Sequence, residues 1–180
     1  MILSLFRRTR SGTISTLYGM IVAQARLPVF YRDYAVADTV NGRFDLIVLH
    51  LALVLDRLTD GGVLDPAGQA LFDLFCQDMD DNLREMGISD LKVPKEMKRM
   101  GQAFYGRSKA YVDALGDRRA LVAALSRNIY GGAPSALANA PRLADYIVRA
   151  VGDLKAQDAA AIIAGRPVFP DPAAVPVPIA

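Results

Sequence analysis

Three carboxylates, Asp78, Asp81 and Glu85, recur at helical spacing in the middle of this 180-residue sequence. Side chains three and four residues apart are neighbours on a helix surface, so the three acids are expected to form one stripe. Such a cluster could hold a hard divalent cation, which prefers oxygen ligands. A di-iron site would also need Glu-x-x-His pairs, and the single histidine, His50, has no glutamate three residues before it. The alternative is a solvated acidic face or a surface for a basic partner, and we predict no bound metal.

A basic stretch follows the acids along the chain. It contains Lys95, Lys98, Arg99, Arg107 and Lys109, with Tyr105 among them. Basic residues interleaved with an aromatic side chain can contact RNA or phosphate groups. The alternatives are pairing with the acidic helix, contact with anionic lipid headgroups, or a solvated face with weak salt bridges. No glycine-rich phosphate loop or RNA-binding signature accompanies the stretch, so the sequence does not favour direct RNA binding.

The sequence contains one histidine, His50, and one cysteine, Cys76. His50 lies in an almost wholly apolar helix, where we expect a buried, hydrogen-bonded histidine; an axial ligand to haem is the alternative. Cys76 lies near an apolar stripe and is interpreted as a small buried hydrophobe. A single cysteine excludes an intrachain disulfide and a cysteine-based metal cluster. We therefore predict no catalytic residue and no cofactor, and keep a helical haem- or quinone-handling carrier as the alternative function.

Charge is segregated between two neighbouring segments. Residues 71–91 carry six acids and one base, whereas residues 92–109 carry six bases and one acid. Leu74 falls on the acidic side of its helix, about 160° from Phe72 at 100° per residue, which suits a docking spot, although single exposed leucines are common. The predicted partner-binding residues are Leu74, Asp78, Asp81, Glu85, Lys95, Lys98, Arg99, Tyr105 and Arg107.

Helices are expected to position these residues, because apolar side chains recur at intervals of three and four. We expect six, over about residues 13–25, 44–58, 66–86, 94–115, 118–130 and 141–164, and no convincing strand. Asp65 and Pro66 are N-terminal signals for the third helix, and Gly87 can close it. The sixth helix is expected to break near Gly152. The apolar stripe of the third helix contains Phe72, Phe75, Met79, Leu83 and Met86.

The second of these helices is apolar nearly all round and should occupy the middle of a bundle. The sequence thus predicts an all-α, single-domain helical bundle of about six helices over residues 13–165. A flexible segment is expected over residues 1–12. Five of the ten prolines follow Arg166, so residues 166–180 are expected to form an extended Pro-rich tail, with disorder as the alternative.

Composition bears on compartment and partners. The formal net charge of +2 is too small to imply DNA or RNA by itself. The N-terminal run lacks the order of a signal peptide; it suits either a frayed terminus or a short anchor on a membrane surface. No stretch reaches the length needed to span a bilayer. We expect a cytoplasmic protein, with a peripheral position on the inner face of the cytoplasmic membrane as the alternative.

The segment LREMGISDLKVPKEMK, followed by AFYGR, resembles the signature of the ubiquinol–cytochrome c chaperone family. The preceding acidic helix and the run DLIVLHLALVLDRL fit the same family. The resemblance spans about residues 31–143 and is strongest over residues 71–107. It implies an all-helical, non-enzymatic assembly factor for respiratory complex III, the quinol–cytochrome c reductase, without catalytic residues.

The resemblance also implies partners. Mitochondrial members act with a small partner protein, bind newly made cytochrome b and can sit at the ribosomal tunnel exit. Relative to those members, we expect this chain to be without their targeting region and membrane-associated segment, and its Ala/Arg-rich composition is typical of a bacterial member. The expected client is cytochrome b or another complex III subunit. The ribosome and the membrane surface are further candidate partners, and a membrane-surface scaffold is the third function considered.

Overall fold

The computed structural model describes residues 2–133 and 136–177, with the side chains of residues 2–11 and 137 left aside. Its α-helices are α1 (Ile2–Ala25), α2 (Pro28–Arg32), α3 (Val40–Arg57), α4 (Pro66–Glu85), α5 (Val93–Val112), α6 (Arg118–Asn128), α7 (Ala136–Ala156) and α8 (Ala159–Ile163). Two short strands, β1 (Thr59–Asp60) and β2 (Val63–Leu64), pair antiparallel, and a 3-10 turn, η1 (Pro172–Ala174), lies in the tail. The prediction of an all-α helical bundle is confirmed.

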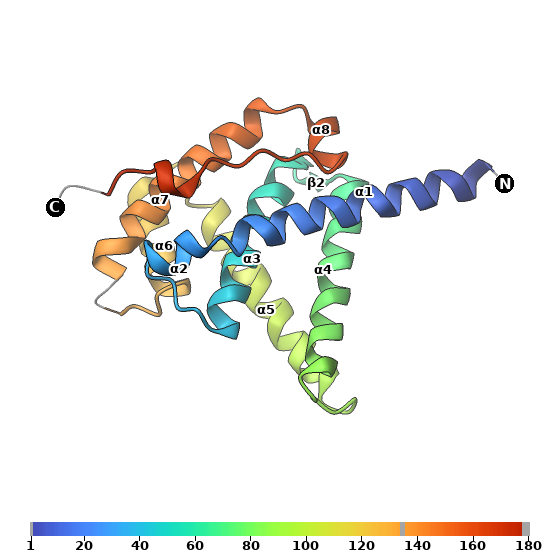
Figure 1. Cartoon of the computed structure of the whole chain (residues 1–180), viewed down its shortest axis with the longest axis horizontal. Coiled ribbons are helices and arrows are strands. Elements are labelled where there is room, and N and C mark those ends of the chain that lie inside the picture. Colours follow the sequence, from blue (N-terminus) through green and yellow to red (C-terminus); the bar gives the residue numbers. More distant parts are fainter. Residues whose placement is uncertain (1, 134–135, 178–180) are drawn as a thin grey trace.

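Helix α3 lies at the centre of the bundle (Figure 1). Every residue from 45 to 54 is buried, and the helix packs against α1, α5 and α7. An apolar surface on all sides is stable only where other helices cover it, so the predicted central position follows directly from composition. None of the described helices combines the length and the apolar character required to cross a membrane.

Helices α4 and α5 form an antiparallel hairpin whose tip projects from the rest of the molecule (Figure 1). The Asp65 side chain accepts a hydrogen bond from the Ala67 amide, 2.6 Å away, and so caps α4 as predicted. Gly87 follows the helix with a φ of 79°, in the left-handed conformation that glycine adopts without strain. The rings of Phe72 and Phe104 lie 5.0 Å apart between the two helices and hold the base of the hairpin together.

The structure corrects several boundaries. The absence of strands was wrong: β1 and β2 form a hairpin around Gly61 and Gly62, both with positive φ, as a two-residue type I′ turn requires. Strands of two residues are too short to show alternation in the sequence.

The last long helix begins before Pro141, which lies in an early turn and removes only one backbone donor. That helix continues through Gly152 and ends at Ala156.

The N-terminal end also differs from expectation. Helix α1 begins at Ile2, not near residue 13. The side chains of residues 1–11 lie outside the described part, so the flexible segment expected over residues 1–12 stays a prediction. The aromatic-rich connection after α1 contains the short helix α2, and α8 follows a cap by Asp158, whose side chain accepts from the Ala160 amide.

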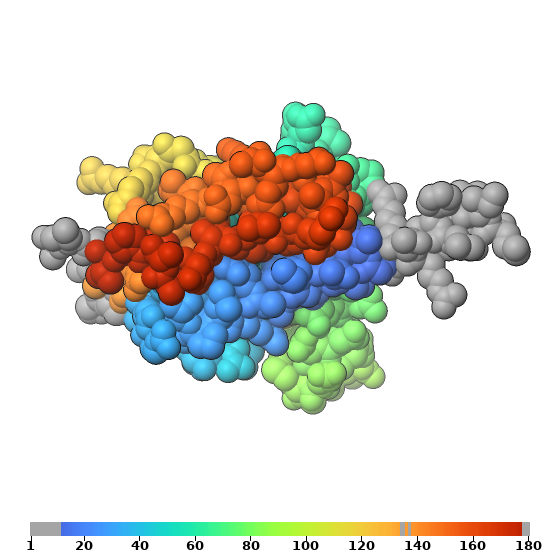
Figure 2. All heavy atoms as spheres, turned by 45° about the horizontal axis from the view of Figure 1, so that its top comes forward, coloured from blue at the N-terminus to red at the C-terminus, as the bar shows by residue number. Residues whose placement is uncertain are grey.

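The Pro-rich tail lies extended against the bundle, with α7 on one side and α1 on the other (Figure 2). The Tyr34 hydroxyl donates to the Pro172 carbonyl across 2.7 Å, and Arg142 Nε donates to the Val175 carbonyl across 3.1 Å. Val175 itself is almost fully buried. Residues 166–177 therefore follow the extended alternative, because polar side chains of the bundle satisfy their backbone carbonyls.

Candidate partner-binding surface

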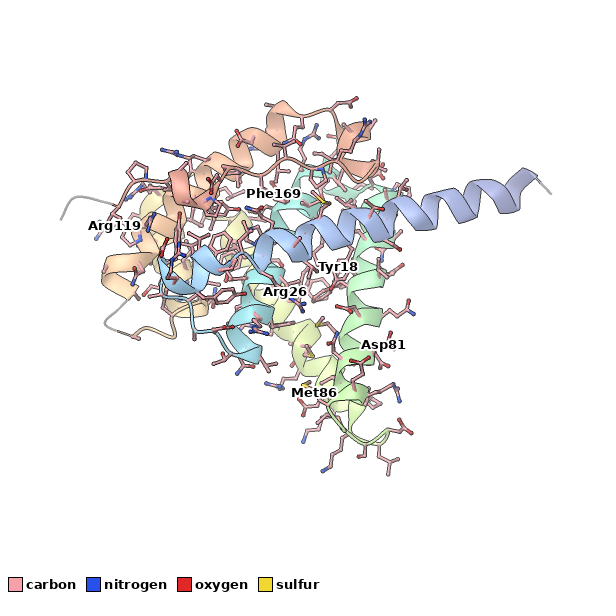
Figure 3. All side chains as sticks on the ribbon, viewed as in Figure 1. Tyr18, Arg26, Asp81, Met86, Arg119 and Phe169 are labelled. Carbon is pink, nitrogen blue, oxygen red and sulfur yellow. The ribbon has the colours of Figure 1, made fainter. Side chains whose placement is uncertain are left out.

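The acidic stripe predicted on the third helix lies on one side of α4. Asp81 and Glu85 are exposed, whereas Asp78 and Leu74 are half-buried. Leu74 packs against the edge of the core. Among the described residues, no hydrogen bond or ion pair is found for the Asp81 or Glu85 side chain, and Asp81 lies on the open face of the hairpin (Figure 3). The stripe is thus divided into an inner pair that supports the fold and an outer pair free to contact a partner.

Asp78 belongs to the inner pair because Tyr18 of α1 donates its hydroxyl proton to Asp78 Oδ2 across 2.7 Å. Burial, followed by the hydrogen bond to this carboxylate, raises the pKa of Tyr18 far above its ordinary value. Tyr18 therefore remains a neutral donor throughout the physiological range. This bond fixes α4 against α1, which the sequence spacing alone did not reveal.

The basic residues of α5 are also divided. Lys95 and Lys98 are exposed on the first turns of α5, next to the hairpin tip. Arg99 is exposed as well, and its Nε donates to Glu96 across 2.8 Å. An exposed pair of this kind contributes little to stability, so the Arg99 charge is still accessible to a partner. These three cations lie on the projecting part of the hairpin, as do Asp81 and Glu85.

Arg107 is not part of the exposed basic face. It is half-buried, with Nη1 3.1 Å from Asp45 Oδ1, and its guanidinium lies 5.8 Å from the centre of the Phe44 ring. Asp45 itself is only 6% exposed. Burial raises the pKa of Asp45 to about 6, and the nearby Arg107 charge offsets part of the increase. Arg107 therefore neutralises a buried carboxylate between α3 and α5.

Tyr105 is exposed, but it lies on another side of the hairpin from the acids. Its ring centre is 5.7 Å from that of Phe72, and Phe72 and Asp78 are six residues apart, roughly 120° around α4. Tyr105 lines a cleft of about 530 Å³ bounded by the end of α3, the β1–β2 hairpin and α5. The structure therefore does not bring the nine predicted residues onto one face.

Two exposed apolar residues at the hairpin tip were missed. Leu91 is 95% exposed and Met86 is 55% exposed. Met86 continues the apolar stripe of α4, and so its spacing predicted a core position. Leu83, in the last turn of α4, is still buried, whereas Met86 lies one residue beyond the end of the helix, at the projecting tip, where its side chain is exposed. The useful sequence signal was the isolated apolar residue Leu91 between Asp90 and Lys92.

His50 is fully buried and hydrogen-bonded, as expected. Its Nδ1 lies 2.8 Å from the Leu46 carbonyl, and its Nε2 lies 2.9 Å from the Tyr146 hydroxyl. A carbonyl only accepts, so Nδ1 carries the proton and Nε2 accepts from Tyr146. Burial lowers the pKa of His50 to about 4, which keeps the ring neutral. Both ring nitrogens have partners, which argues against an axial-ligand role.

Metal and nucleophile chemistry find little support in the described residues. Within them, no group of three or more His, Cys, Asp or Glu side chains could hold a metal ion. Cys76 is a half-buried free thiol, and burial raises its pKa, with Asp73 adding to the effect. A raised pKa disfavours the thiolate that nucleophilic chemistry requires.

The chain is similar to known proteins in both sequence and structure. Residues 32–169 match the family model described as ubiquinol-cytochrome C chaperone. A crystal structure of the Cbp3 homolog from Brucella abortus is similar at a TM-score of 0.83 and 37% sequence identity, covering 98% of this chain and 100% of that one. No protein with a curated description matches the chain.

Proposed function

This chain belongs to the ubiquinol-cytochrome C chaperone family, and we propose from that premise that it is a non-enzymatic assembly factor that binds cytochrome b of complex III. The observation that carries the proposal is the agreement of the family match with a structural likeness over nearly the whole chain. The likeness extends beyond the matched segment, so it includes the helix and the tail that flank it.

The projecting α4–α5 hairpin is the proposed contact surface. Its tip presents Met86 and Leu91, two exposed apolar residues, at the end of a charged stem. Apolar residues surrounded by charge are typical of interface centres, where burial supplies most of the affinity and the polar rim supplies orientation. Asp81, Glu85 and the exposed cations of α5 would form that rim.

The charges on the two sides of the hairpin have opposite sign, which gives a bound segment a preferred direction. Complementary charges raise association rates and suppress wrong orientations more than they add affinity. A chaperone that must release its client benefits from this division, because few apolar contacts keep the complex short-lived. The role requires no catalytic group on the protein.

The test uses photocrosslinking in cells of the source organism. A photoreactive amino acid is placed at Leu91 or at Asp81, and at Arg119 on α6 as a matched exposed control. We expect cytochrome b to be captured from the first two positions and not from the third. In parallel, deletion of the gene should lower the cytochrome b absorbance of isolated membranes. Normal complex III levels in the deletion strain would contradict the proposed function.

A further inference from the structure

A second charged feature lies away from the hairpin, where α1 ends. A cleft of about 590 Å³ is bounded by the end of α1, by α2 and by the start of α3. It is lined by Arg26, Pro28, Tyr31, Arg32, Asp38 and Arg43. All of these side chains except Tyr31 are exposed, so the cleft is open to solvent. Arg26, which directly follows the last residue of α1, is labelled in Figure 3.

Positive charge dominates this cleft. Arg43 Nε donates to Asp38 Oδ1 across 2.7 Å, and Arg32 donates from Nε and Nη2 to the two carboxylate oxygens of the adjacent Asp33. Among the described residues, the Arg26 side chain has no hydrogen-bonding or ion-pair partner. Both internal pairs use only part of each guanidinium, which carries five N–H donors. One full charge and several N–H groups therefore remain for a ligand.

The cleft is also partly organised before any ligand binds. Tyr31 donates its hydroxyl to the Ala25 carbonyl across 3.1 Å, and Arg32 and Arg43 each lie in an exposed ion pair with a neighbouring carboxylate. Side chains already fixed lose less conformational entropy on binding than mobile ones do. The Pro28 ring and the half-buried Tyr31 ring add flat apolar surface beside the guanidinium groups.

We propose that this arginine cleft binds an acidic segment of a protein partner, with a carboxylate as the recognised group. Guanidinium forks suit carboxylates and phosphates equally well. Three observations favour the carboxylate. Both internal partners of the cleft are carboxylates, the site is open enough to admit a chain segment, and the chain belongs to a family of proteins that act on other proteins. The inference goes beyond the proposed function, because the acidic segment need not belong to cytochrome b.

The position of the cleft adds a geometric condition. Arg26 directly follows α1, the helix whose Tyr18 hydroxyl holds Asp78 of the acidic stripe. The molecule thus carries a basic cleft beyond the end of α1 and an acidic stripe on α4, the helix that Tyr18 bonds to α1. A second copy of this chain, offering its own acidic stripe, is the competing occupant of the cleft.

The test measures fluorescence anisotropy of labelled probes added to the full-length protein. The probe is a short fluorescein-labelled peptide of alternating Glu and Ala; a Gln/Ala peptide, an RNA oligonucleotide and vesicles containing anionic lipid serve for comparison. The variants are Arg26→Gln and Arg43→Gln, with Arg119→Gln as the matched loss of an exposed arginine elsewhere (Figure 3). Circular dichroism checks that each variant is folded.

We expect salt-sensitive binding of the Glu/Ala peptide, weakened roughly tenfold by either cleft substitution and unchanged by Arg119→Gln. Four outcomes would overturn the proposal: no binding of the peptide, equal weakening by the control substitution, tighter binding of the RNA or the vesicles, or a dimer in sedimentation that the cleft substitutions dissociate. None of these readouts depends on complex III, so failure here leaves the proposed function intact, and the reverse also holds.

Discussion

The hydroxyl of Tyr18 lies 2.7 Å from Asp78 Oδ2 and joins α1 to α4, although the two residues are 60 positions apart in the chain. The bond separates Asp78 from Asp81 and Glu85, which share its side of the helix but face solvent. Within one stripe of acids, Asp78 therefore holds two helices together, whereas Asp81 and Glu85 stay accessible to a partner.

This division predicts different effects for two neighbouring acids. Asp78→Ala should destabilise the fold by about 1–2 kcal/mol, because it leaves the Tyr18 hydroxyl without its acceptor. Asp81→Ala should change the free energy of unfolding by less than about 0.5 kcal/mol. Urea denaturation followed by circular dichroism measures both. Equal stability of the two variants would show that the Tyr18–Asp78 bond contributes nothing.

Replacing Asp78, Asp81 and Glu85 together by lysine should therefore lower the stability of the fold as well as change the surface charge. We expect the destabilisation of such a triple variant to come from Asp78. A double reversal at Asp81 and Glu85 is therefore the cleaner test of client binding.

The raised pKa of Asp45 predicts a specific pH dependence. Its carboxyl has a pKa of about 6 in the folded protein against 3.8 as the ordinary value, so the folded state binds more protons between these limits. Stability contributed by this group is present below about pH 4 and falls as pH rises to about 6, by on the order of 2–3 kcal/mol. The charge that faces it is that of Arg107, whereas Tyr111, whose pKa is raised by burial, stays neutral in this window. Relative to wild type, Asp45→Asn should therefore make stability rise more steeply with pH between about pH 4 and 6; an unchanged profile would contradict the assignment.

The lowered pKa of His50 predicts the opposite pH dependence of folding stability. Its pKa is lowered from 6.5 to about 4 by burial, so the unfolded state binds more protons in that window. Stability from this group is fully present above about pH 6.5 and is lost as pH falls towards 4. His50→Gln should remove that dependence, measured as unfolding free energy against pH relative to wild type. The opposing contributions of Asp45 and His50 make the wild-type profile flatter than that of either single variant.

The hairpin tip should matter for binding and not for folding. Leu91 is 95% exposed, so Leu91→Ser should leave the melting temperature within about a degree of wild type and reduce crosslinking to the client. Val63, an exposed valine on β2, provides the matched control as Val63→Ser. Loss of crosslinking in both variants would show that replacing any exposed apolar residue by serine weakens binding, and that the hairpin tip has no special role.

The tail should depend on Gln157. This side chain accepts from the Val168 amide across 2.7 Å and donates to the Val168 carbonyl across 2.8 Å. Gln157→Ala should cost about 1–2 kcal/mol locally and accelerate hydrogen exchange at the Val168 amide. Lys155→Ala, an exposed neighbour on α7, serves as the control. Unaltered exchange at Val168 would mean that other contacts hold the tail alone.

Much of the fold followed from the sequence, because helix periodicity, caps and apolar content are local properties. The Asp65 cap begins α4 where it was predicted, and α6 begins at Arg118, the expected first residue. The burial of residues 45–54 followed from their composition. The acidic stripe on α4 followed from spacing alone, since residues three and four apart share a helix face.

Tertiary structure decided which of these charges are used within the molecule. Arg107 looked like part of a basic face until Asp45 of α3 was found beside it, and Met86 looked like a core residue although no helix covers it. The arginine cleft joins Arg26 and Arg43, which no local pattern connects. Burial and pairing depend on neighbours that long-range packing supplies, whereas periodicity fixes only the direction in which a side chain points.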